Sequence, residues 1–202
     1  IKNVKMIPRY DLETTDDDFL DYLMSTHGVA VLKWGDYPES YPVNVDINED
    51  QAYQYCGDYA DMYLDAVVNA INLWNNKIGF NYFNYENVDE INRKILIDYT
   101  RSEGLPQFSP VYIQDLDGRY RIDSGTIFLL NGDGNFEYIQ LIAEHELGHG
   151  TGWGNHPTNN LSIMHPVSWN PAYWVHVSDD DGYVVRVNNI LPNNTYWCNY
   201  TQ

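Results

Sequence analysis

Apolar residues recur at three- and four-residue steps between positions 59 and 78, which is the spacing of one buried face of an α-helix. The apolar positions of this stripe are Tyr59, Met62, Tyr63, Ala66, Val67, Ala70, Ile71, Trp74 and Ile78. Gly79 follows directly, and glycine is the residue type that most often ends a helix. We therefore expect one long helix here, with its aromatic face in the core.

Other stretches alternate apolar and polar residues or form short β-branched runs, which is typical of strands. Four segments have this character: 42–47, 95–99, 111–113 and 125–130. The last is followed by the turn-forming run 131–134, and a second helix is predicted from about Phe136 to about Thr151. Strand, long helix, strands and helix in this order predict an α+β fold with helices packed on one sheet.

The amino-terminal region has a weaker pattern. A short helix could begin at Thr15 or Asp16 and end at Gly28. We divide the chain into an N-terminal segment, 1–32, which is either a pro-segment or an extension, and one domain, 33–202. Two cysteines are too few for a disulfide framework. Cys56 and Cys198 form either one bridge or two buried thiols.

The composition narrows the possible partners. The chain has 202 residues, 44% of them hydrophobic, and a net charge of −18 from 29 acidic and 11 basic side chains. This charge opposes binding to nucleic acid and to anionic membranes. No apolar run approaches the roughly 18 residues of a membrane-spanning helix, so we expect a soluble monomer. The scarcity of lysine and the abundance of tyrosine and asparagine favour a secreted protein, or alternatively a virion-associated one.

The predicted second helix carries the chemistry. His145 and His149 are four residues apart, so both imidazoles lie on one helical face and can bind one ion. Neutral imidazoles suit Zn²⁺. When three protein ligands bind this ion, a fourth coordination position remains for water. Glu146 lies on the adjacent face, within reach of that water, and is the candidate general base.

Two further features follow this helix: Gly152, three residues after His149, and a turn at 162–166 with Met164 at its centre. Together they resemble the extended HExxHxxG motif and the Met-turn of the metzincin zinc endopeptidases, closest to the matrixin-like branch. The resemblance is strong over 136–166 and loose over 33–191. It implies a twisted, mostly parallel sheet with an antiparallel edge strand, a long backing helix and an active-site helix.

One position departs from the pattern. The third metal ligand of the family stands three residues after the glycine, where this chain has Asn155, with His156 next to it. An amide oxygen is a weak zinc ligand compared with an imidazole. The sequence favours His156, carried to the metal by a one-residue extension, with Asn155 as the alternative.

The resemblance also implies roles for residues outside the helix. Met164 would form an apolar floor under the metal ligands. The strand 125–130, with Ile127 and Phe128, would be the sheet edge that pairs with a peptide substrate. Trp169 and Tyr173 would line the pocket for a substrate side chain.

The function we expect is therefore zinc-dependent hydrolysis of peptide bonds in a protein or peptide substrate. The alternative is a catalytically inactive zinc-bearing module, such as a virion component, which the asparagine at the ligand position favours. Acidic turns at 115–118 and 131–135 have oxygen ligands at a spacing that suits Ca²⁺, although a solvated turn explains each of them as well.

Overall fold

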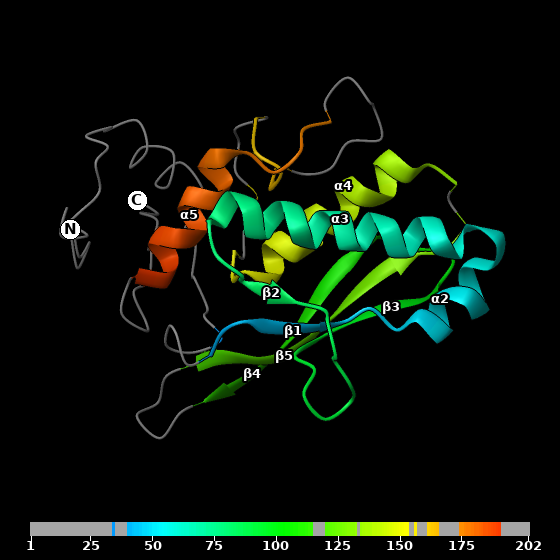
Figure 1. The fold of residues 1–202 in the computed structure, drawn as a ribbon, viewed down its shortest axis with the longest axis horizontal. Coiled ribbons are helices and arrows are strands. Elements are labelled where there is room, and N and C mark those ends of the chain that lie inside the picture. The colour runs from blue at the N-terminus through cyan, green and yellow to red at the C-terminus, as the bar shows by residue number, and fades with distance from the viewer. Residues whose placement is uncertain are drawn as a thin grey trace, which may run out of the picture.

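A computed structural model of the chain shows a five-stranded sheet with its main helices arranged beside it (Figure 1). The structure describes residues 34, 40–114, 120–132, 134–153, 156, 161–165 and 174–190. The strands are β1 (Val43–Asp46), β2 (Phe83–Asn84), β3 (Ile95–Arg101), β4 (Gln107–Gln114) and β5 (Tyr120–Leu130). The helices are α2 (Glu49–Cys56), the 3₁₀ turn η1 (Gly57–Tyr59), α3 (Ala60–Ile78), α4 (Phe136–Gly150) and α5 (Asp179–Ile190).

The sheet has the order β2-β1-β3-β5-β4, and its ladders are parallel except for the last pair, β5 with β4. The expected α+β fold with a mostly parallel sheet and an antiparallel edge strand is thus confirmed. The long helix and the metal-motif helix were also predicted close to their observed bounds.

The identity of the edge strand was predicted wrongly. The segment 125–130 belongs to β5, which lies between β3 and β4, and the antiparallel edge is β4. Ile127 is paired with Ile97 on one side and Phe108 on the other. Phe128 is likewise paired on both sides. Their backbone groups lie between two strands, so neither residue can pair with a substrate in the way we expected.

Helix α3 packs against α4 and thereby fixes the position of the motif helix (Figure 1). Trp74 is fully buried on α3, and its indole N–H donates to the carbonyl oxygen of Glu144 at 2.7 Å. Gly79 ends α3 in the left-handed conformation, with φ at 87°, as its position in the sequence predicted. The carboxyl end of α4 has a further contact, because Trp34 Nε1 donates to the Gly150 carbonyl at 2.7 Å.

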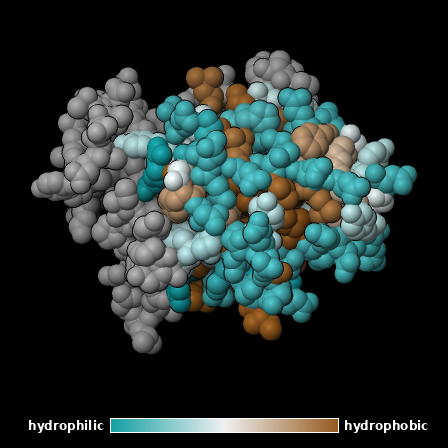
Figure 2. Space-filling model, in the orientation of Figure 1, coloured by the Kyte–Doolittle hydropathy of each residue, from teal (hydrophilic) through white to brown (hydrophobic). Residues whose placement is uncertain are grey.

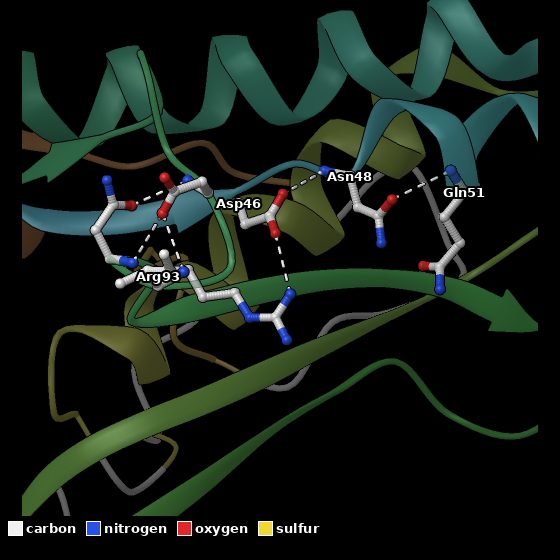
Figure 3. A network of polar contacts seen from close by, with 7 residues as sticks. Asp46, Asn48, Gln51 and Arg93 are labelled. Atoms are coloured by element: carbon white, nitrogen blue, oxygen red, sulfur yellow. Dashed lines mark hydrogen bonds and ion pairs between the residues drawn. The ribbon is translucent and has the colours of Figure 1, made fainter.

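Helix α2 was not predicted, and a polar network fixes it to the sheet (Figure 3). Asn48 caps the helix by accepting from the Gln51 N–H, and its own N–H donates to Asp46 at the end of β1. The other oxygen of Asp46 accepts from Arg93 at 3.2 Å. The Gln51 side chain in turn accepts from the N–H of Tyr99 on β3. These bonds connect the carboxyl end of β1 to the start of α2 and to Arg93, and they connect α2 to β3.

Among the coloured residues of Figure 2, hydrophilic ones predominate on the face shown, with apolar patches between them. Within the described ranges, no helix is both long enough and apolar enough to span a membrane. Cys56 is a buried free thiol whose pKa burial raises to about 11, while Cys198 lies outside the described residues. The predicted helix at 15–28 and the 32/33 domain boundary also lie outside them.

Candidate metal centre

Helix α4 carries the first two histidines of the cluster, His145 and His149. Asn135 caps its amino end, accepting from the Tyr138 N–H. His145 is only 4% exposed, and His149, one turn later, is half-buried. The four-residue spacing thus gives the common face that the sequence predicted.

His156 completes the cluster. Its Nε2 lies 3.0 Å from Nε2 of His145 and 3.3 Å from Nε2 of His149. All three ligand atoms lie within 4.8 Å of one another. Tetrahedral zinc at normal Zn–N distances separates its nitrogen ligands by about 3.3 Å, so the spacing suits that ion. Of the two candidates for the third position, the structure brings His156 into the cluster, and Asn155 lies outside the described residues.

Backbone carbonyls fix which nitrogen of two rings carries the proton. Nδ1 of His145 lies 2.7 Å from the carbonyl oxygen of Ile163, and Nδ1 of His149 lies 2.6 Å from that of Trp153. A carbonyl oxygen can only accept, so each Nδ1 is the donor and each Nε2 of a neutral ring has its lone pair free. These lone pairs converge on the space shared with His156. A cation between them satisfies all three, and the residues present therefore fit a metal ion.

The electrostatics favour the neutral, ligating form of the rings. Burial, with repulsion from His149, lowers the pKa of His145 to about 3. Burial also lowers the pKa of His149 to about 4 and lowers the pKa of His156. Neutral imidazoles need lose no proton to bind a metal near pH 7.

Met164 packs against α4 at Gly148, which lies between His145 and His149 in the sequence. It is fully buried, and a Cβ added to Gly148 would lie 2.1 Å from its sulfur. Only glycine at that position therefore lets the methionine approach the helix between the two ligands. This position is compatible with the floor under the ligands that the resemblance implies, which stays a prediction.

A buried carboxylate on α5 holds the turn that contains Met164. Asp181 is fully buried and accepts from the Ser162 hydroxyl at 2.5 Å. It also accepts from the N–H and hydroxyl of Ser178, whose oxygen accepts from the Asp181 N–H in return. This reciprocal pair is a capping box at the start of α5. It anchors the turn whose Ile163 carbonyl orients His145.

Glu146 faces a cavity of about 330 Å³ beside the histidines. The cavity is lined by Leu105, Pro106, Gln107, Phe108, Tyr138, Ile142, His145, Glu146, His149 and His156. Burial raises the pKa of Glu146 to about 7, opposed by one hydrogen bond from the N–H of Phe108. A carboxyl group with this pKa can both accept and return a proton near neutral pH.

Two sets of polar contacts at the site were not predicted from the sequence. Glu144, fully buried, accepts from Gln140 Nε2 at 2.7 Å, His176 Nδ1 at 2.9 Å and the Val177 N–H at 3.0 Å. The second is the Phe108 N–H bond to Glu146. No spacing in the sequence links His176 to Glu144, and only the fold brings the two together. An acidic residue at a buried position of an apolar helix face was the one available signal.

Of the other predicted site residues, two are described by the structure and two are not. Ile127 and Phe128 do not line the cavity beside Glu146. Trp169 and Tyr173 lie outside the described residues. Within the described residues, the three histidines are the group that could hold a metal ion, and no acidic group joins it. In the turn proposed for calcium, Asn135 serves as the helix cap and Asn131 donates to the Tyr99 carbonyl.

No protein-family model matches the chain, and no curated protein matches it by sequence. The functional interpretation therefore depends on the geometry of the site.

Proposed function

We propose that the chain is a zinc-dependent endopeptidase of the metzincin type, closest to the matrixin-like branch. The observation that carries the proposal is the convergence of three imidazole Nε2 atoms next to the Glu146 carboxylate in one cavity. The buried Met164 and the left-handed Gly152, with φ at 92°, agree with the motif of that clan.

The residues divide the work in a simple way. His145, His149 and His156 hold the ion, which when bound supplies a Lewis acid that acidifies water and polarises a carbonyl. Glu146 accepts the proton of the attacking water and returns it to the leaving amine. Ile163 and Trp153 keep two imidazoles in the ligating tautomer through their carbonyl oxygens.

The cavity supports a peptide as the substrate. One of its walls is the amino end of β4, the edge strand, along which an extended chain can add by backbone hydrogen bonds. Its apolar lining includes Leu105, Phe108, Tyr138 and Ile142. We therefore propose preference for a large apolar side chain next to the cleaved bond, and action on extracellular proteins.

Cleavage of a denatured protein by the zinc-loaded chain tests the proposal, with the cut sites mapped by mass spectrometry. We expect cleavage that a chelator stops and that zinc restores. Glu146→Ala should retain stoichiometric zinc and cut nothing, which separates the carboxylate from the metal.

Stoichiometric zinc without cleavage of any sequence in a peptide library would contradict the proposal. That result would favour the inactive zinc-bearing module instead.

A further inference from the structure

The main-chain N–H of Phe108 donates to Oε2 of Glu146 at 2.6 Å. The donor belongs to β4, the edge of the sheet, and the acceptor is the proposed general base on α4. The ring of Phe108 is seated over Gly125, where an added Cβ would lie 2.3 Å from the ring. This packing fixes Phe108, and with it the direction of its N–H.

That N–H lies on the outer side of β4, with which no strand of the described residues pairs. In an antiparallel ladder, the N–H and C=O of one residue point to the same side, and the next residue points to the other. Phe108 is opposite Ile127, and since its N–H reaches Glu146 it faces away from β5. Pro110, two residues further along β4, shares its direction and has no N–H, and Pro106, directly before the strand, has none either.

Between residues 107 and 110, the side of β4 that faces away from β5 therefore offers two carbonyl oxygens, those of Phe108 and Pro110, but one donor. The partner of Pro110 in the ladder, Gly125, agrees with this direction. Its N–H donates to the Lys94 carbonyl, on the side of β5 away from β4, and not to Pro110. A peptide strand that adds to this edge must direct one of its carbonyls to the Phe108 N–H. The same N–H is already bonded to Glu146.

We propose that this single N–H is exchanged between Glu146 and a substrate carbonyl, so that Phe108 is a positioning residue for the general base. In the free protein it holds the Glu146 carboxylate. When a peptide pairs with β4, the Phe108 N–H donates to a peptide carbonyl in place of Glu146. Oε2 of Glu146 then has no donor from Phe108 and is available to accept a proton. The inference rests on the proposed function and deepens it.

The exchange also defines the substrate class. Replacing a bond to a carboxylate by a bond to a neutral carbonyl is unfavourable by itself, because charge-assisted bonds are stronger. Peptide N–H groups donating to the carbonyls of Phe108 and Pro110 can offset that cost. Only an extended chain of several residues supplies them, so short amides and esters are poor substrates.

Hydrogen exchange at the backbone amides of the 202-residue chain, labelled with ¹⁵N-phenylalanine, tests this proposal. The chain has six phenylalanines, so the spectrum is simple. In metal-free protein, Glu146→Ala should speed exchange at Phe108 by about tenfold or more, as expected for loss of a bond to a charged group. Phe128, paired on both sides within the sheet, is the matched control and should not change. Equal Phe108 rates in the two proteins would overturn the proposal.

A second comparison uses zinc-loaded Glu146→Ala, which cannot cleave, with a blocked ten-residue Leu/Ala peptide. Saturating peptide should restore slow exchange at Phe108, whereas a blocked dipeptide should not. If no peptide concentration slows hydrogen exchange at the Phe108 amide, the proposed change of hydrogen-bond acceptor is wrong. The first comparison needs neither zinc nor cleavage, so its failure is distinguishable from failure of the proposed function.

Discussion

Glu144 and Glu146 are two residues apart on α4, and both are buried, at 0% and 6% exposure. Glu144 accepts three hydrogen bonds, from Gln140, His176 and Val177. Among the described residues, Glu146 has one donor, the N–H of Phe108, and it otherwise faces the cavity. The first carboxylate is satisfied and fixes the chain that precedes α5, while the second has lone pairs left for chemistry.

The number of hydrogen-bond donors around a buried carboxylate distinguishes a structural glutamate from a reactive one on the same helix. Burial without sufficient partners raises the pKa of a carboxyl group, and Glu146 at about 7 is the example. A carboxylate surrounded by donors instead becomes a cross-link, whose removal leaves those donors unpaired. Substitutions at the two positions should therefore have opposite consequences for activity and stability.

The largest expected effect is on catalysis. Glu146→Gln should lower kcat for peptide cleavage by about 10²–10⁴-fold, because the proton acceptor is lost. Zinc content should stay at one ion per chain, since Glu146 lies beside the ligand group and not within it. Kinetics with metal analysis on the same samples measures both. Glu144→Gln is the control and should keep kcat within a few-fold per folded, zinc-loaded molecule; equal losses in the two variants would remove the distinction.

The next effect is on folding. Glu144→Ala should lower the free energy of unfolding by about 3 kcal/mol, because it removes three hydrogen bonds at about 1 kcal/mol each, one of them from the buried N–H of Val177. Urea denaturation of the metal-free chain measures this loss. Glu146→Ala in parallel should show no such loss at pH 7. A stable Glu144→Ala protein would mean that the cross-link contributes nothing.

The pH dependence of stability separates the two acids further. The folded pKa of Glu146, about 7, lies above its unfolded value of 4.5. Its favourable contribution is therefore complete below pH 4.5 and is lost as the pH rises through 7. Relative to the wild type, metal-free Glu146→Gln should gain up to about 3 kcal/mol between pH 4.5 and pH 8. Denaturation midpoints across that range measure the difference, and a constant offset would contradict the raised pKa.

The smallest effect concerns one donor to Glu144. His176→Ala should cost about 1–2 kcal/mol, because two of the three hydrogen bonds remain. The exposed pair of Lys77 with Asp179 provides a control, since Lys77→Ala should cost less than about 1 kcal/mol. Thermal denaturation of both variants ranks them. A larger loss for Lys77→Ala than for His176→Ala would show that burial does not govern these contacts.

Local spacing explains what could be predicted from the sequence. Periodicity gave α3 and α4 nearly residue by residue, and the His145–His149 spacing fixed a shared face because helix geometry leaves no alternative. His156 was predicted in preference to Asn155 from ligand chemistry alone.

Long-range pairing explains what could not. Phe108 and Glu146 are separated by 38 residues, and Glu144 and His176 by 32. Strand order decides which strand is the edge, and the alternation within 125–130 is the same for an interior strand as for an edge strand. Helix α2 depends on a polar network among Asp46, Gln51 and Tyr99 that no hydrophobic pattern reveals.

The central claim is that three imidazoles hold one zinc ion, and X-ray absorption at the zinc edge of the purified chain tests it most directly. We expect one ion per chain with three imidazole nitrogens at about 2.0–2.1 Å. His156→Ala should reduce that shell to two imidazoles. Substoichiometric zinc, or a shell without imidazole scattering, would contradict the account.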